Sequence, residues 1–420
     1  MSAAAITVMA GLILCYALVA RRLTLANLTA PMLSVLAGVL VFSFAKIDID
    51  ASFVHNIAEL TLIIILFHDA STVKLSKLRQ DPGIAVRLLV IGFPLALVAT
   101  YFVTSAMLPT LGVAGAWLIA ASITPTDAGL GAPTVLNPKV PMRVRRGLNV
   151  ESGLNDGLAT PIVLLALMAL AAEEGDTTPG LLKIGVVPVL LALLCATVLG
   201  LAAGWAMDRS RTYRLSTARG RSIATLLLPL LMFGVAELVH ANAFITAFVG
   251  GLVFGAACIT LNEDHETAGL LETAADLLGF VVWFLAGGLL LLIFQEGFQW
   301  EWLILAVLAL TVLRMVPVAI SMIGTGFQWQ TVAFLGWFGP RGLATIVFGL
   351  LAVEELGTDS PVIGDVAGVL ALTVLLSVFA HGISAGPLSQ AYGAWAKRTD
   401  ATILQDTSVE PAPPRGHTGY

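Results

Sequence analysis

The segment Glu151–Asp156, with the sequence ESGLND, places two carboxylates and an amide inside an apolar run that covers residues 147–173. A run of this length can cross the hydrocarbon core of a bilayer as a helix. A charged side chain at the bilayer centre costs about 2.5–3.5 kcal/mol, so membrane proteins keep one where it has a partner, a cavity or a function. We therefore interpret this segment as the centre of an ion- or proton-handling site.

The composition of the whole chain indicates an integral membrane protein. Of its 420 residues, 58% are hydrophobic and 12% are charged, whereas a soluble domain has roughly 45–50% apolar and 25% charged residues. Long apolar runs separated by short polar loops predict an all-α polytopic protein with about thirteen transmembrane helices. The predicted spans are 3–20, 31–47, 56–73, 83–107, 111–136, 147–173, 181–207, 222–241, 243–260, 268–295, 301–324, 329–354 and 361–386.

Basic residues fall in alternate loops, and this asymmetry predicts the orientation, because Lys and Arg in short loops stay on the cytoplasmic side. We expect the N-terminus outside, the C-terminus in the cytoplasm, and a location in the cell (inner) membrane. Residues 399–420 contain three prolines and are expected to form a disordered cytoplasmic tail. The basic residues of the predicted inner loops are Arg21, Arg22, Lys74, Lys77, Arg79, Lys139, Arg143, Arg145, Arg146, Arg209, Arg211, Arg214, Arg219 and Arg221.

Two predicted spans contain residues that interrupt a helix. The fifth span carries TPTDAGLGAP at 124–133, which includes Asp127, and the twelfth carries GPRG at 339–342, which includes Arg341. Broken helices at membrane depth are tolerated where they line protein or a watery cavity, and their free carbonyls and helix ends can bind ions. The two spans are seven apart, and an odd offset inverts their orientation, so we expect inverted repeats with a site between them.

The sixth span supplies the candidate carrier. Glu151 with Asn155 and Ser152 with Asp156 are i,i+4 pairs, so the four side chains form two adjacent stripes on one helix. Desolvation favours the neutral form of Asp156, and a bound cation favours its carboxylate, so this group can exchange a proton for a cation. The alternatives are a structural, hydrogen-bonded Asp156 and a Glu151 that reaches the inner interface.

Two arginines deep in the predicted membrane, Arg314 and Arg341, each need an anion or a polar cavity. We expect Arg314 to pair with Glu151. In the third span, Asp69 is either a second cation ligand or an interfacial acid close to Lys74.

Other titratable residues near the predicted inner side receive structural interpretations. His68 is expected to be a polar neighbour rather than a proton relay, and His381 to make a structural hydrogen bond. Glu272 and Asp276 form an i,i+4 acidic pair expected at the inner mouth, where they would attract cations at most.

Several function classes are disfavoured. The chain has no GxxxxGK[ST] loop, so ATP-driven transport is not expected, and its three cysteines lie singly in apolar runs. An intramembrane aspartyl protease would use Asp127 and Asp156 as a dyad, but the chain lacks a Gly-x-Gly-Asp segment. We expect no enzyme activity, no cofactor and no nucleic-acid partner. The alternative that remains is a channel or proton-coupled symporter for an organic solute, in which Arg341 would bind a carboxylate.

These motifs together resemble those of monovalent cation/proton antiporters of the NhaP and sodium/proton exchanger type. The likeness rests on Thr126-Asp127, on the run from Glu151 to Gly157, on GPRG at 339–342 and on His381-Gly382. The resemblance implies the NhaA/NhaP-like fold, in which unwound helices 5 and 12 cross. It further implies a homodimer whose membrane domain, residues 1–398, comprises a six-helix transport bundle (83–173 and 301–386) and a dimerisation scaffold.

Carried over to this chain, the resemblance implies a secondary antiporter that exchanges a monovalent cation for H⁺ by alternating access. Na⁺ is the first expectation, with Li⁺ and K⁺ as alternatives. Asp156 would be the shared cation and proton carrier, with Ser152 and the Thr126 carbonyl as further Na⁺ ligands. Asn155 would hold Asp127, and because electrogenic relatives carry Asp at the Asn155 position, electroneutral exchange is implied. Ala128 departs from the commoner Thr-Asp-Pro pattern.

Overall fold

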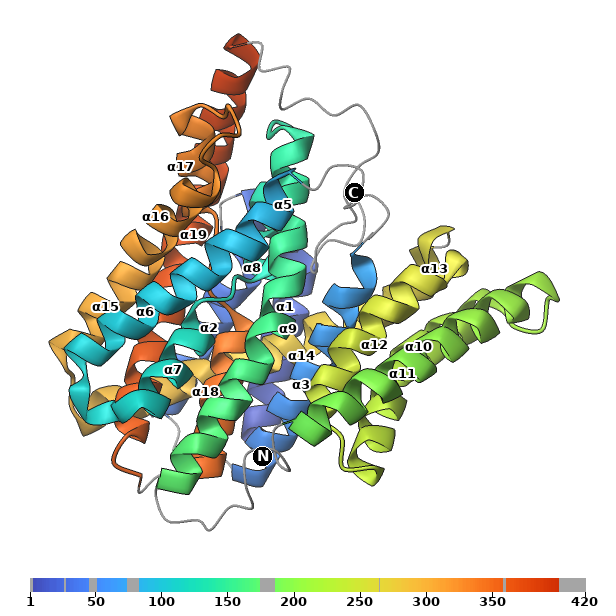
Figure 1. The fold of residues 1–420 in the computed structure, drawn as a ribbon, viewed down its shortest axis with the longest axis horizontal. Coiled ribbons are helices and arrows are strands. Elements are labelled where there is room, and N and C mark those ends of the chain that lie inside the picture. The colour runs from blue at the N-terminus through green and yellow to red at the C-terminus, as the bar shows by residue number, and fades with distance from the viewer. Residues whose placement is uncertain are drawn as a thin grey trace.

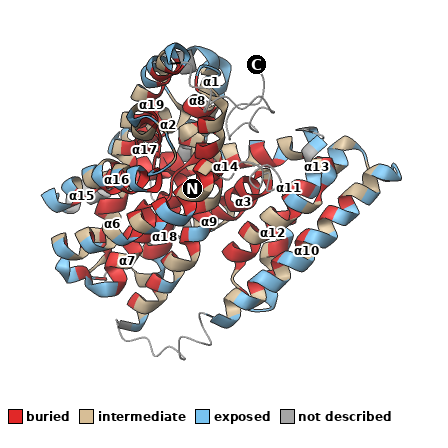
Figure 2. Ribbon diagram, turned by 45° about the horizontal axis from the view of Figure 1, so that its top comes forward, coloured by how far each residue is buried: buried red, intermediate tan, exposed pale blue. Residues whose placement is uncertain are grey.

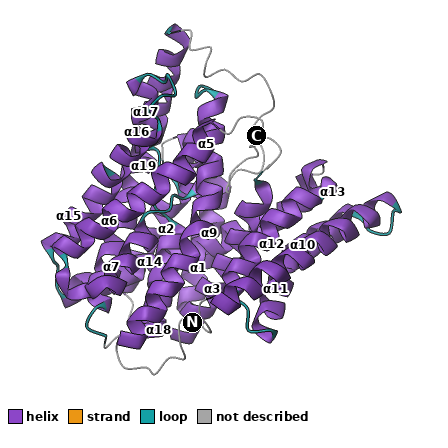
Figure 3. Cartoon of the chain, viewed as in Figure 1, coloured by secondary structure: helices purple, strands orange, loops and turns teal. Residues whose placement is uncertain are grey.

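The computed structural model describes residues 3–25, 28–44, 51–73, 83–173, 186–263, 265–357 and 360–399. Within these ranges all regular elements are helical and no strand occurs (Figure 3). The predicted all-α class is therefore confirmed. The inner loop with Lys74, Lys77 and Arg79 and the predicted tail from residue 400 onward lie outside the described residues.

The first half of the chain leads to the long helix that carries the ESGLND segment (Figure 1). Its elements are α1 (Ala3–Leu25), α2 (Ala30–Phe44), α3 (Ala51–Thr72), α5 (Gly83–Arg87), the π-helical η1 (Leu88–Gly92), α6 (Phe93–Met107), the 3₁₀ turn η2 (Pro109–Leu111), α7 (Gly112–Ile123), α8 (Ala128–Val135) and α9 (Met142–Glu173).

The second half contains the helical hairpin of α10 and α11, which extends to one side of the molecule, and a second broken span, α17 and α18. Its elements are α10 (Val187–Thr212), α11 (Ala218–Leu238), α12 (Ala243–Ala257), α13 (Ile259–Glu263), α14 (His265–Glu296), α15 (Trp300–Leu310), α16 (Val312–Ser321), α17 (Trp329–Trp337), α18 (Leu343–Leu356) and α19 (Ile363–Arg398).

Length and hydropathy support a multi-pass membrane protein. Among the described residues, seven helical segments are long and apolar enough to cross a bilayer, and α2 and α12 are shorter apolar helices. Each of the predicted spans overlaps one helical element or two to three consecutive ones. The number of helices that cross the membrane, thirteen by sequence, stays a prediction.

The helices are interrupted where the sequence places proline and glycine. The chain leaves helical geometry at 124–127, between α7 and α8, and at 338–342, between α17 and α18. The two interruptions touch, because the backbone N–H of Asp127 donates to the Pro340 carbonyl at 2.7 Å. The inverted-repeat relation between the two halves stays a prediction.

The buried core surrounds these interruptions. In Figure 1, α10, α11 and α13 extend to one side of the molecule, while α6 and α15–α17 lie on the other, with α9 between them. Exposed residues follow α10 and α13, whereas buried residues concentrate around α3, α9 and α18 (Figure 2). The candidate site is therefore held in the most enclosed part of the molecule.

Candidate functional site

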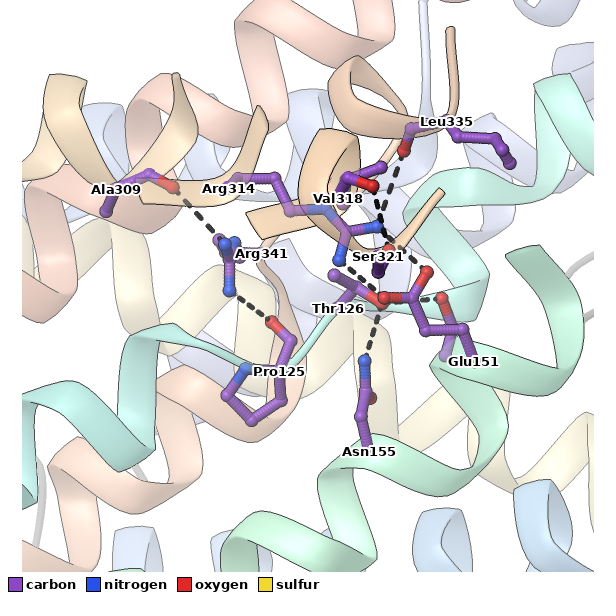
Figure 4. A network of polar contacts seen from close by, with 11 residues as sticks. Pro125, Thr126, Glu151, Asn155, Ala309, Arg314, Val318, Ser321, Leu335 and Arg341 are labelled. Atoms are coloured by element: carbon purple, nitrogen blue, oxygen red, sulfur yellow. Dashed lines mark hydrogen bonds and ion pairs between the residues drawn. The ribbon is translucent and has the colours of Figure 1, made fainter. Parts of the chain in front are cut away.

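Three of the predicted ligand residues meet where the α7–α8 interruption faces α9. The Thr126 and Ser152 hydroxyl oxygens lie 2.8 Å apart, and Nδ2 of Asn155 donates to the Thr126 hydroxyl at 2.7 Å (Figure 4). All three residues are buried, and so is Asp156, which follows Asn155 on α9. The interruption brings Thr126 to α9 because the chain leaves helical geometry at 124–127, with a bend at Thr124 and Pro125 and extended backbone at Asp127. These oxygens are the hard ligands that alkali cations prefer.

Asn155 also contains a polar atom without a partner. Its Oδ1 is buried and accepts no hydrogen bond, while the residue as a whole is fully enclosed. A buried acceptor left unsatisfied costs about 1–3 kcal/mol. The site therefore holds an oxygen that a bound cation would satisfy.

The prediction that Asn155 holds Asp127 is wrong. Asp127 is the N-cap of α8, where one carboxylate oxygen accepts from the Leu130 N–H at 2.9 Å, and the other accepts from the Leu343 N–H at 2.8 Å at the start of α18. The free N–H groups and the positive end of each helix dipole attract the carboxylate more directly than a single amide does. Asp127 thus joins two helix N-termini. Its predicted role as a cation ligand stays a prediction.

Arg341 places a positive charge at helix C-termini, whereas Asp127 places a negative charge at helix N-termini. Its guanidinium donates to the Pro125 carbonyl at 3.1 Å and to the Ala309 carbonyl at 3.2 Å, near the C-terminal ends of α7 and α15 (Figure 4). Its backbone N–H donates to the Ser377 hydroxyl at 2.6 Å. Only 1% of Arg341 is exposed, and cations are stabilised at helix C-termini. Backbone carbonyls, rather than a carboxylate, therefore hold this charge.

The predicted partner of Arg314 is confirmed. Nη2 of Arg314 donates to one Glu151 carboxylate oxygen at 2.8 Å, and Nη1 donates to the other (Figure 4). The two residues therefore form a bidentate ion pair between α16 and α9. Both side chains are almost completely buried. Glu151 therefore does not reach the inner interface, and its charge is used within the protein.

The two glycines of GPRG make room for these charged groups. A methyl group at position 342 would overlap the Asp127 carboxylate, and one at position 339 would overlap the Arg314 guanidinium. Residues without a Cβ are therefore required on both sides of Pro340 and Arg341. The motif is explained by this close approach of charged side chains to the backbone.

The histidines differ in their surroundings. One His381 ring nitrogen lies 2.8 Å from the Trp337 carbonyl and the other 3.0 Å from the Ser377 carbonyl, so the expected structural hydrogen bonding is confirmed. On α3, Nδ1 of His68 lies 3.0 Å from Oδ1 of Asp69, and both are buried. The two alternatives for Asp69, a cation ligand and an interfacial acid, both stay predictions.

Sequence reasoning missed Ser377 and Thr345 as parts of the site's framework. Thr345 donates to the Ser122 carbonyl at 2.8 Å, and this bond ties α18 to α7. The signal that was available is the position of Ser377 one helical turn before His381. No cluster of three or more His, Cys, Asp or Glu side chains that could hold a metal ion occurs among the residues that the structure describes.

Residues 9–391 match the family model described as "Sodium/hydrogen exchanger, transmembrane". The chain is 25% identical over 308 residues to a Na⁺/H⁺ antiporter of Schizosaccharomyces pombe, an alignment that covers 66% of this chain and 65% of the relative. It is 26% identical over 320 residues to Na⁺/H⁺ antiporter 2 of Zygosaccharomyces rouxii, covering 66% of this chain and 38% of that one. The chain thus spans less than two-thirds of the length of these relatives, which are named as transporters and not as enzymes.

The fold matches a solved structure over nearly its whole length. The sodium proton antiporter MjNhaP1 from Methanocaldococcus jannaschii at pH 8 superimposes with a TM-score of 0.72, covering 93% of this chain and 98% of that one. The sequence identity is 19%, so the comparison establishes the shared fold.

Proposed function

This chain belongs to the sodium/hydrogen exchanger family, and from that premise we propose that it exchanges a monovalent cation for H⁺ across a membrane. Na⁺ is the first candidate, and Li⁺ and K⁺ are the alternatives. The cation and the proton compete for the Asp156 carboxyl group, which is exposed to the two sides in turn.

The observation that carries this proposal is the buried oxygen cluster beside Asp156. The hydroxyls of Thr126 and Ser152 meet at 2.8 Å, and the unpartnered Oδ1 of Asn155 lies on the same helical turn as Asp156. The helix interruption also leaves the Thr126 carbonyl outside a helical hydrogen-bond ladder. Carboxylate, hydroxyl and carbonyl oxygens are suitable ligands for a small hard cation.

The number of uncompensated carboxylates supports the proposal that the exchange is electroneutral. Glu151 is neutralised by Arg314, and Asp127 is bound by two helix N-termini. Asn155 occupies the position beside Asp156 where a second acid would add a further charge. A single carboxyl group that carries either one proton or one monovalent cation moves the same charge in both directions.

Competition at one carboxyl group has a direct consequence for pH. Lower pH converts more Asp156 to the protonated form, so a higher cation concentration is needed to load it. We expect the KM for Na⁺ to rise as pH falls, by up to about tenfold per pH unit where the protonated form dominates. Uptake of ²²Na⁺ at several pH values measures this shift, and a KM that is independent of pH would contradict competition.

The larger assembly is proposed on the same basis. The bundle formed by 83–173 and 301–386 would move against a scaffold that also forms a homodimer. The membrane would be the cell membrane, with the N-terminus outside and the tail 399–420 in the cytoplasm, because the basic loops favour the inner side. No cofactor is proposed, since the transported ions are the substrates.

The test is cation-driven proton movement in proteoliposomes with an acidic interior. Addition of NaCl, LiCl or KCl should collapse the pH gradient with wild-type protein and not with Asp156→Asn. Glu355→Gln, which removes an exposed carboxylate at the end of α18, is the matched control and should behave as wild type. If no cation collapses the gradient at any pH, exchange is ruled out, and the symporter or channel for an organic solute becomes the better hypothesis.

A further inference from the structure

A surface groove lies between α16 and α17, outside the site described above. It has a volume of about 560 Å³, and the described residues that line it are all hydrophobic or glycine. Val316, Ile323 and Trp329 are among them and are 50%, 70% and 74% exposed. A contiguous exposed apolar surface of this kind marks a site of contact with a partner or with membrane lipid. In a chain that spans a bilayer, the groove is suited to a hydrocarbon chain.

One end of the groove lies at the loop that joins α16 to α17. Gly324 and Gly326 in this loop line the groove, and a Cβ at either position would meet no atom within 4 Å. The groove is therefore open at this end. Trp329, the first residue of α17, is of the type that concentrates at the level of lipid headgroups. On the predicted orientation, this loop faces the cytoplasm, so the open end meets the headgroups of the inner leaflet.

Arg87 lies at the open end, and the backbone fixes one side of its guanidinium group. Nη1 donates to the Ile323 carbonyl at 2.9 Å and to the Ser321 carbonyl at 3.1 Å. In the described part of the chain, these carbonyls are its hydrogen-bond acceptors, and no carboxylate pairs with it. A guanidinium group has five N–H donors in a planar fork. The edge formed by Nε and Nη2 is therefore available for the two oxygens of a phosphate group.

A second arginine borders the groove from the first turn of α9. The guanidinium carbon of Arg143 lies 5.6 Å from the centroid of the Phe327 ring, which lines the groove. This cation–π contact holds the positive charge beside the aromatic wall of the groove. Arg87 and Arg143 are both half-buried, so part of each side chain remains accessible. Two positive charges from separate segments of the chain thus meet at the open end of one apolar groove.

We propose that this groove binds an anionic phospholipid of the cytoplasmic leaflet. The phosphate group lies at Arg87 and Arg143, and one hydrocarbon chain follows α16 and α17. The lining residues of α16 run from Met315 to Ile323, a length of about 12 Å at the helical rise of 1.5 Å per residue. A free anion would use only the arginines, whereas an anionic lipid uses both the charges and the groove. Basic pockets between transmembrane helices on the cytoplasmic side recognise such headgroups.

The elements around the groove assign the lipid to one part of the molecule. Arg87 belongs to α5 and Arg143 to α9, and both α16 and α17 line the groove. All four elements belong to the proposed transport bundle, so the lipid stabilises their packing and moves with them. The inference is separate from the exchange reaction, because it requires only that the chain lie in a membrane.

The test identifies the lipid in the groove through the fluorescence of Trp329. Bromine atoms on a hydrocarbon chain quench a tryptophan that the chain contacts, and the difference between wild type and Trp329→Phe isolates this side chain. The protein is reconstituted in vesicles of equal amounts of phosphatidylglycerol and phosphatidylcholine, with one of the two lipids brominated at a time. We expect the anionic lipid to be preferred at Trp329 by about fivefold for each arginine, which corresponds to ~1 kcal/mol.

Charge variants separate this site from the general attraction of a basic surface. Arg87→Gln and Arg143→Gln should each lower the preference for phosphatidylglycerol about fivefold, and Arg87→Lys should retain part of it, because lysine keeps the charge but not the fork. The matched control is Arg219→Gln, which removes an exposed charge from α11, on the opposite side of the molecule from α16 and α17 (Figure 1). It should leave the preference at Trp329 unchanged.

A second measurement covers a variant that does not fold well. Phosphatidylglycerol should raise the melting temperature of the detergent-purified wild type more than phosphatidylcholine does, and Ala319→Phe, which fills the groove but keeps both arginines, should abolish this difference. If Arg87→Gln cannot be purified, Arg143→Gln and Ala319→Phe decide the outcome. Equal quenching of Trp329 by the two brominated lipids would overturn the proposal. It is also overturned if Arg219→Gln lowers the preference as much as the variants at the groove.

Discussion

Replacement of Glu151 by methionine should strongly destabilise the protein, because it leaves the Arg314 charge buried without its partner. The pair makes two charge-assisted hydrogen bonds, and the side chains of Arg314 and Glu151 are 4% and 1% exposed. The other acceptor near the guanidinium is the Leu335 carbonyl, at 3.4 Å, which is too long for a strong bond. Loss of one partner of such a pair costs about 3–5 kcal/mol, which corresponds to a fall in melting temperature of roughly 3–6 °C for a chain of this size.

The assay is thermal unfolding of detergent-purified protein, followed by the loss of the monodisperse chromatographic peak after heating. Glu151→Met and Arg314→Met should each show the large loss, whereas the double variant should lose much less, because it buries no unpaired charge. Glu263→Gln is the matched control, since it breaks the exposed Arg211–Glu263 pair, which is worth about 0–1 kcal/mol. A double variant whose loss equals the sum of the single losses would refute the reasoning.

Three further changes test the site. Gly342→Ala places a methyl group against the Asp127 carboxylate and should reduce Na⁺-driven proton flux about 100-fold, whereas Gly364→Ala, which meets no neighbour, should retain it. Ser152→Ala removes one proposed ligand and should raise the KM for ²²Na⁺ uptake about tenfold, as expected for a loss of ~1.4 kcal/mol, while Ser105→Ala on α6 should leave that KM unchanged. Asn155→Asp adds a carboxylate beside Asp156 and should make the exchange rate depend on an imposed membrane potential; a rate that ignores the potential would argue against the charge assignment.

Local sequence features predicted much of the framework. Apolar runs are sufficient to identify membrane helices, because backbone groups in lipid must be satisfied within the helix. Pro125 and Pro340 mark the interruptions because proline cannot donate to a helical ladder. The Glu151–Arg314 pair was predictable because a buried arginine needs an anion and few acids lie at the same depth.

The partners of Asp127 and Arg341 could not be predicted in the same way. Asp127 binds the N-terminus of α18 and Arg341 the C-terminal ends of α7 and α15, and these helix ends approach only after the two interruptions pack together. Helix periodicity gives the face on which a residue lies, but not the helix that covers that face.

The charges at the depth of the interruptions explain why an empty carrier would not cross. Asp127 and Arg341 offset the opposite ends of broken helices, and Glu151 and Arg314 neutralise each other, so these four charges sum to zero within the proposed moving bundle. The charge of Asp156 then determines the net charge of these five side chains together. This net charge is zero when Asp156 carries a proton or a monovalent cation, and −1 when the site is empty. Moving the unloaded carboxylate through a low-dielectric barrier carries a penalty of at least the ~2.5–3.5 kcal/mol found for a single charge at the bilayer centre. Such a penalty would suppress the empty transition about 70- to 370-fold, and this suppression would favour the proposed exchange over a leak.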